Sequence, residues 1–194
     1  MLVLASASKA RQKLLDQIAL SCKVIVSDFD ETNVQELDPL INVRLLAKCK
    51  AETVFKNLIE GKKPLNNFQA LLGCDSLFEF KGEVFAKPIN KDQLINRWKR
   101  MSGQSGFLHT GHHLISIGNS KTDSRNNTPN ECCEAVVSTK IEFISLSNSD
   151  IIKYASMPEP YNCAGGFAIE GKGGLFIKKS MGVLVMLWDL AYLG

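Results

Sequence analysis

LASASKAR, residues Leu4–Arg11, follows the apolar start of the chain and decides how its first two elements are built. The apolar run Leu2–Ala5 predicts a short buried strand, and Ser8 is a residue type that caps helices, ahead of a helix predicted over Arg11–Ile18. A strand that passes directly into a helix is typical of α/β folds. Two roles remain open for this stretch: a plain helix cap, or an anion site made of hydroxyls, N–H groups and Arg11 at the start of the helix.

The remaining periodicity predicts one α/β domain over residues 1–194. Strands and helices alternate early, and paired strands dominate later. The polar segment 118–134, rich in Asn, Ser and Thr, predicts a loop or hairpin tip. The predicted strands cover 2–5, 23–26, 68–72, 107–117, 135–145 and 175–177, and the predicted helices cover 11–18, 40–55, 92–101 and 150–155.

Composition excludes several classes of protein. The chain is 45% hydrophobic and 22% charged, which is ordinary for a globular domain, and its net charge of +3 is too small to argue for a nucleic-acid or membrane partner. It contains no apolar run of about 20 residues and no signal-peptide pattern at its start. The six cysteines form no CxxC pair, which indicates reduced thiols and predicts a cytoplasmic protein.

Polar side chains follow three of the predicted strands. Ser6, Ser8 and Arg11 follow the first, Glu31 follows the second, and Asp75 follows the strand predicted at 68–72. Because ligands of open α/β sheets bind outside the carboxyl ends of strands, we expect these groups to line one cleft. Glu31 and Asp75 are either surface acids or ligands for a hard divalent cation, and a carboxylate could also take a proton from water.

Two lysines are ambiguous in the same way. Lys50 lies on a predicted helix, where a lysine is usually solvated. Lys87 precedes Pro88, which fixes a turn and aims the lysine side chain. Rival chemistries lack their motifs: the chain has no GxxxxGK[ST] and no GxSxG. The histidines of FLHTGHHL have no zinc-site spacing, so surface or packing roles are expected for them.

Six stretches match, in order, the motifs of one enzyme family. They are LASASKAR, DFDET, LAKCKAETV, GCDSLFEFKGEVFAKP, MSGQSGFLHTG and EPYNCAGGFAIEGKGGLFI. They resemble, respectively, an S-x-S-x-x-R signature, an acidic turn, an L-A-x-x-K-A helix, a G-x-D-[TS] block ending in K-P, an S-G turn closed by T-G, and an E-P segment ending in [EQ]-G. From Leu4 to Ile177 the chain is therefore similar to the Maf family of nucleoside triphosphate pyrophosphatases.

The resemblance implies a fold and a reaction. The fold is an elongated mixed sheet flanked by helices, with two lobes around a central cleft, related to the inosine-triphosphate pyrophosphatases. The reaction is hydrolysis of a nucleoside triphosphate, canonical or modified, between its α and β phosphates, with Mg²⁺ or Mn²⁺. The products are the nucleoside monophosphate and pyrophosphate. Phosphate chemistry is mostly positioning and charge neutralisation, which a metal with Lys and Arg supplies.

The resemblance also assigns roles by position. Asp75 would accept the proton of the attacking water, and Glu31 would help Asp75 to bind the metal. Lys50 and Lys87 would belong to the catalytic group and would hold the triphosphate with Ser6, Ser8 and Arg11.

Base preference is left unassigned. The family's subgroups differ at the positions of Ala10, Ser76 and Glu170: members that prefer dTTP and UTP have Arg, Thr and Gln there, whereas members that prefer 7-methyl-GTP have Trp, Gln and Glu. This chain matches the second subgroup only at Glu170. Whether the protein forms a homodimer is left open. The runner-up function is a catalytically impaired nucleotide-binding regulator linked to septum formation.

The tail 180–194 does not resemble the family's ending, S-N-V-x-G-L-[PS]-L-P. Codons that can encode Leu184–Leu193 give Ser-Asn-Val-Met-Gly-Leu-Ser-Leu-Pro in a shifted frame, and the codons of Trp188 and Asp189 force the Gly. We hypothesise a frameshift near Lys179–Ser180, against the alternative of a genuinely divergent tail. Sequencing the gene decides between them.

Overall fold

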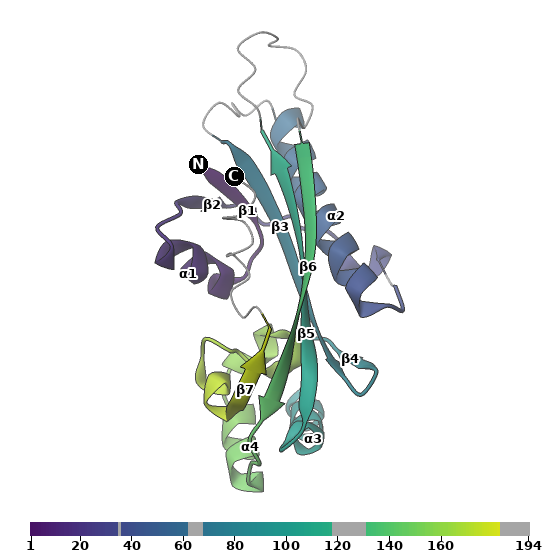
Figure 1. Ribbon diagram of the computed structural model, residues 1–194, viewed down its shortest axis with the longest axis vertical. Helices are drawn as coiled ribbons and strands as arrows, with labels where there is room; N and C mark the ends of the chain where they lie inside the picture. The colour runs from purple at the N-terminus through teal and green to yellow at the C-terminus, as the bar shows by residue number, and fades with distance from the viewer. Residues whose placement is uncertain (35, 62–67, 118–130, 183–194) are drawn as a thin grey trace. The chain divides into compact units, whose positions relative to one another are not determined.

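The computed structural model describes residues 1–34, 36–61, 68–117 and 131–182, and these form a seven-stranded mixed sheet with helices packed on it (Figure 1). The strand order is β2-β1-β3-β5-β6-β7, and β4 pairs with β3 off this path. The pairs β1–β2 and β1–β3 are parallel, whereas β3–β4 and β6–β7 are antiparallel. The predicted α/β class is confirmed. The strands are β1 (Leu2–Ala5), β2 (Cys22–Val24), β3 (Ala70–Phe80), β4 (Glu83–Phe85), β5 (Ser105–Ser116), β6 (Glu131–Phe143) and β7 (Ile177–Met181).

The described residues divide into two compact units. Unit 1 is formed from residues 1–75 and 110–136, and unit 2 from residues 76–109 and 137–182. The strands β3, β5 and β6 contribute residues to both units. None of the helices in the described part of the chain could span a bilayer.

In unit 1, β1 pairs with β2 and β3, and all four residues of β1 are buried. Its side chains alternate between two core clusters: Val3 and Ala5 pack with residues of α2 (Pro39–Glu60), whereas Leu2 and Leu4 pack with Leu15 of α1 (Lys9–Gln17). These helices therefore cover opposite faces of the sheet. Asp38 caps α2 by accepting from the backbone N–H groups of its first turn, with Pro39 at the first helical position.

Unit 2 has an aromatic core beneath α3 (Lys91–Met101) and α4 (Asn148–Ala155). Trp98 makes edge-to-face contacts with Phe143 and Tyr154, at ring-centroid distances of 5.2 and 5.6 Å. The segment after α4 contains three short 3₁₀ helices, which are η3 (Glu159–Asn162), η4 (Ala164–Gly166) and η5 (Lys172–Phe176).

Several predicted boundaries were wrong. The strand predicted at 68–72 runs instead from Ala70 to Phe80, so Asp75 and Ser76 lie inside β3 rather than after a strand end. The extension pairs with β4, which follows a tight turn at Lys81–Gly82. Residues 131–134 of the predicted polar loop belong to β6, and residues 175–176 of the last predicted strand belong to η5. Positions 118–130 and 183–194 lie outside the described residues, so the tail hypothesis stays a prediction.

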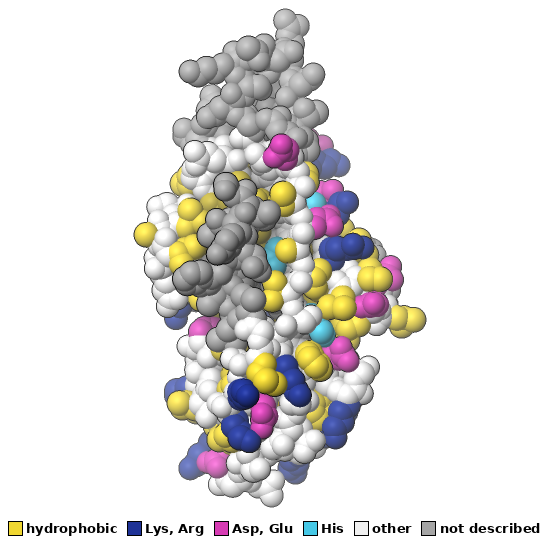
Figure 2. Space-filling model, viewed as in Figure 1, with side chains coloured by type: hydrophobic (Ala, Val, Ile, Leu, Met, Phe, Trp, Pro, Cys, Tyr) yellow, Lys and Arg dark blue, Asp and Glu magenta, His cyan; other side chains and the backbone are white. Residues whose placement is uncertain are grey.

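The surface carries charges of both signs. On the face shown in Figure 2, Lys and Arg side chains lie among Asp and Glu side chains rather than in a patch of one sign. Two exposed ion pairs in unit 2 illustrate this mixing: Lys178 Nζ lies 2.7 Å from Glu142, and Arg100 Nη2 lies 2.5 Å from Glu83.

Candidate functional site

The centre of the candidate site is Lys50, which bridges two acids of unit 1. Its Nζ lies 2.5 Å from Asp75 Oδ1 and 2.8 Å from Glu31 Oε1. The side chains of Lys50 and Asp75 are each 12% exposed, whereas that of Glu31 is 52% exposed. The structure thus brings together three residues predicted from different segments. It leaves the acid pair open to solvent on the side of Glu31.

Local packing explains why these three side chains meet. Gly73 precedes Asp75 by two positions on β3, so both face α2. A Cβ at Gly73 would collide with the carbonyl oxygen of Ala47, so glycine lets α2 approach the strand closely enough for Lys50 to reach Asp75. Glu31 begins the 3₁₀ turn η1 (Glu31–Asn33), which Asp30 caps by accepting from the backbone N–H of Thr32.

The opening stretch forms a second group in unit 1. Ser8 Oγ accepts from the backbone N–H of Arg11, so the predicted helix cap is confirmed. Arg11 Nη1 donates to Ser6 Oγ at 2.8 Å and to the carbonyl oxygen of Cys74 at 3.1 Å. The guanidinium therefore ties the first turn of α1 to the residue that precedes Asp75. Ala10 lies half-buried in the same turn. The anion site stays a prediction.

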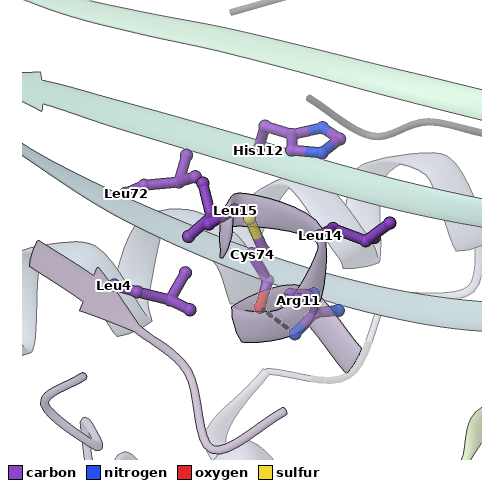
Figure 3. Close-up of a pocket in the computed structure, with 7 residues that line it drawn as sticks. All are labelled: Leu4, Arg11, Leu14, Leu15, Leu72, Cys74 and His112. Carbon is purple, nitrogen blue, oxygen red and sulfur yellow. Dashed lines mark hydrogen bonds between the residues drawn. The ribbon is translucent and has the colours of Figure 1, made fainter. Parts of the chain in front are cut away.

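Sequence reasoning missed a small apolar pocket in unit 1. It is lined by Leu4, Arg11, Leu14, Leu15, Leu72, Cys74 and His112 (Figure 3). Burial raises the pKa of the Cys74 thiol to about 11, so the thiol stays protonated and apolar in character at neutral pH. Cys74 and Asp75 are successive strand residues and point to opposite faces of β3. The pocket therefore lies on the sheet face opposite the acid group.

Unit 2 holds the other predicted site residues, Ser76, Lys87 and Glu170. Ser76 is half-buried, and the other two are exposed. Burial and the charges of Glu170 and Glu159 together raise the pKa of the Cys163 thiol to about 11, while the charge of Lys87 acts in the opposite direction. Lys87 and Glu170 therefore both lie in unit 2 within the electrostatic surroundings of the same thiol.

The residues that could hold a metal are Glu31 and Asp75. Both offer carboxylate oxygens, the donors preferred by Mg²⁺ and Mn²⁺. No cluster of three or more His, Cys, Asp or Glu suited to a metal occurs among the described residues. Mg²⁺ is commonly held by one or two carboxylates together with substrate phosphates and water. The pair therefore fits a cation that arrives with a phosphorylated substrate better than a permanently caged ion.

The histidines of β5 have structural partners. His109 Nδ1 lies 2.8 Å from Ser138 Oγ, and its Nε2 lies 3.1 Å from Glu79 Oε2. His113 Nδ1 lies 3.0 Å from Glu134 Oε1. These buried rings join neighbouring strands, which confirms the expected packing role for two of the three histidines.

Comparison with known proteins matches the chain to one family. The family model described as Maf-like protein matches residues 1–185. A protein of Prochlorococcus marinus (strain NATL1A), named nucleoside triphosphate pyrophosphatase, is 74% identical over 179 residues, which cover 92% of this chain and 85% of that protein. Proteins with the same name are 46% identical in Prochlorococcus marinus (strain MIT 9301), over 94% of this chain and 91% of theirs, and 43% identical in Microcystis aeruginosa (strain NIES-843 / IAM M-2473), over 93% and 84%.

Proposed function

Since the chain belongs to the Maf-like protein family, we propose that it is a nucleoside triphosphate pyrophosphatase. It would hydrolyse the bond between the α and β phosphates and release the nucleoside monophosphate and pyrophosphate. The observation that carries the proposal is the contact of Lys50 with both Asp75 and Glu31. The names of the similar proteins support the same reaction.

Asp75 is the proposed general base. Its carboxylate would take a proton from a water molecule as the water oxygen bonds to the α phosphorus and pyrophosphate leaves. Lys50 already holds Asp75 Oδ1 at 2.5 Å, which fixes the direction of the carboxylate. An ammonium is also attracted to phosphate oxygens, so a bound triphosphate would compete with Asp75 for Lys50. That competition would free the carboxylate for the proton transfer.

The substrate contacts are proposed in two groups. Ser6, Ser8 and Arg11 would bind phosphate oxygens at the start of α1, where the helix dipole also favours an anion. In unit 2, Lys87 would bind phosphate as well. Ala10, Ser76 and Glu170 would contact the nucleoside, with no base assigned.

A divalent cation belongs to the proposal. Glu31 and Asp75 would hold Mg²⁺ or Mn²⁺, and the bound ion would neutralise charge on the phosphate oxygens as the bond breaks. The runner-up, a nucleotide-binding regulator without turnover, is not favoured, because Asp75 and Lys50 are both present and in contact. A cytoplasmic location, expected from the six thiols, is part of the same proposal.

The test is product analysis of the wild-type chain. Canonical and modified triphosphates are incubated with Mg²⁺, with Mn²⁺ and with a chelator, and the phosphorus products are separated. We expect monophosphate and pyrophosphate in equal amounts, with the chelator abolishing turnover. Release of the nucleoside diphosphate and orthophosphate would show that a different phosphate bond is hydrolysed. Binding of triphosphates without any turnover would favour the runner-up function, a nucleotide-binding regulator.

A further inference from the structure

The segment that carries Glu170 is held from both sides by side chains of unit 2. Ahead of Glu170, the backbone N–H of Ala168 donates to the hydroxyl of Tyr154 at 3.3 Å. Beyond Glu170, Glu159 accepts from the backbone N–H of Lys172 at 3.1 Å and of Gly173 at 3.0 Å. Glu170 therefore lies between two anchored points of the backbone.

The two anchoring side chains are hydrogen-bonded to each other, because the Tyr154 hydroxyl donates to Glu159 Oε1 at 3.0 Å. The Tyr154 ring is only 1% exposed and packs edge-to-face against Trp98 and Phe176. This packing fixes the position of the hydroxyl, and the hydroxyl in turn fixes the carboxylate. We call Tyr154 and Glu159 the clamp.

Two glycines let the backbone approach the clamp closely. A Cβ at Gly171 would lie 2.5 Å from Glu159 Oε2, and a Cβ at Gly173 would lie 2.5 Å from the Tyr154 hydroxyl oxygen. Both positions therefore require glycine so that the peptide groups can approach the clamp. Glu170 itself is exposed. Because the backbone on both sides of Glu170 is anchored, the chain loses little backbone freedom when this carboxylate binds a ligand.

We propose that Glu159, acting with Tyr154, is a positioning residue for nucleoside selection by Glu170. The inference rests on the proposed function, which places Glu170 against the nucleoside. Glu159 does not touch the substrate: its carboxylate is occupied by three donors of the chain itself. Its effect on the reaction passes through the place that it gives to Glu170. Loosening the clamp should therefore weaken discrimination among nucleosides and leave the phosphate chemistry intact.

The test measures the two clamp variants, Glu159→Gln and Tyr154→Phe. They are compared with Glu170→Ala, which removes the proposed nucleoside contact itself, and with the control Glu142→Gln. Glu142 is an acid of β6 in unit 2 whose partner is Lys178, so it serves as the matched control. The substrates are a panel of nucleoside triphosphates and methyl triphosphate, which has the phosphate chain but no nucleoside. Calorimetric binding of the same panel gives a readout that is independent of turnover.

Both clamp variants should raise KM for the preferred nucleotide by up to about tenfold, the equivalent of one hydrogen bond, with kcat nearly unchanged. The clamp variants should also discriminate less among nucleotides than the wild type does, and Glu170→Ala should show the same loss of discrimination. Turnover of methyl triphosphate, and all values for Glu142→Gln, should stay at the wild-type level. Glu159→Ala should be worse than Glu159→Gln, because glutamine keeps one acceptor oxygen.

An equal loss for every substrate, methyl triphosphate included, would overturn the inference, and so would an unchanged preference in folded clamp variants. Thermal unfolding separates loss of fold from loss of position, and Tyr154→Phe is the milder variant if Glu159→Gln unfolds. Wild-type protein that binds triphosphates selectively without turnover would overturn the proposed function alone. A flattened binding preference in the clamp variants would then still support the inference.

Discussion

Asp75 in unit 1 and Glu159 in unit 2 are both partly buried carboxylates, but their partners differ in kind. Glu159 accepts from one tyrosine hydroxyl and from two backbone N–H groups, which cannot leave without moving the chain. Asp75 is held by the Lys50 ammonium, at the end of a flexible side chain that a phosphate group can attract away. A carboxylate with fixed partners stabilises a loop, whereas one with an exchangeable partner remains available for chemistry.

After Asp75 itself, the largest expected effect is on Lys50. Replacing it by methionine keeps the apolar stem but removes the charge that bridges Asp75 and Glu31, so kcat should fall by about 10²–10³. Lys56→Met on the same helix is the control, because the Lys56 side chain is 72% exposed and pairs only with Glu60 among the described residues. Steady-state pyrophosphate release measures both. Equal activity of the two variants would contradict a role for Lys50 in the reaction.

Ser8 separates the two roles left open for the opening stretch. Aspartate caps helices as well as serine does, so Ser8→Asp should keep the fold but repel a triphosphate, raising KM by about tenfold. The measurement is KM beside the melting temperature. A KM that stays at the wild-type value would leave only the structural role.

Ser8→Ala tests the cap itself. Losing the acceptor for the Arg11 N–H should cost about 1 kcal/mol of unfolding free energy, seen as a shift of the urea midpoint. Asn148→Ala, at the first residue of α4 rather than at its Ser147 cap, is the comparison and should shift the midpoint less. A midpoint equal to that of the wild type would mean that the Ser8 hydroxyl does not stabilise α1.

The smallest expected effect concerns the pH dependence of the clamp. Burial raises the pKa of Glu159, but hydrogen bonds from Lys172, Gly173 and Tyr154 lower it more, so the pKa lies below its ordinary value of 4.5. A lowered pKa contributes stability that is complete above pH 4.5 and is lost as the pH falls through the folded-state value. The melting-temperature difference between wild type and Glu159→Gln should therefore be constant from pH 6 to about pH 5 and shrink below pH 4.5. A difference that grows on acidification would contradict this.

Local signals were enough to predict the elements of unit 1 that carry the site. Ser8 begins α1 as predicted, and the apolar spacing over 40–55 lies within α2. Both signals are contained in a few neighbouring residues. The place of Asp75 inside β3 was not predictable in this way, because the length of that strand depends on its pairing with β4 across the turn.

The contacts of unit 2 were missed for a related reason. The bonds from Glu159 to the backbone of Lys172 and Gly173 join a side chain to peptide groups more than a dozen residues away. The His109 contacts with Glu79 and Ser138 span three strands. No sequence periodicity predicts such pairs, because they depend on which distant segments the tertiary fold brings together. Motif resemblance located Glu170 but could not show what anchors it.

The most direct test of the reaction centre is Asp75→Asn measured beside Asp16→Asn, an exposed acid of α1, with pyrophosphate release and thermal unfolding recorded for each. Asparagine keeps the size of the side chain but is a far weaker proton acceptor. Asp75→Asn should stay folded and lose about 10²–10⁴ of kcat, while Asp16→Asn stays at the wild-type rate. Wild-type turnover by folded Asp75→Asn would contradict the assignment of Asp75 as the general base.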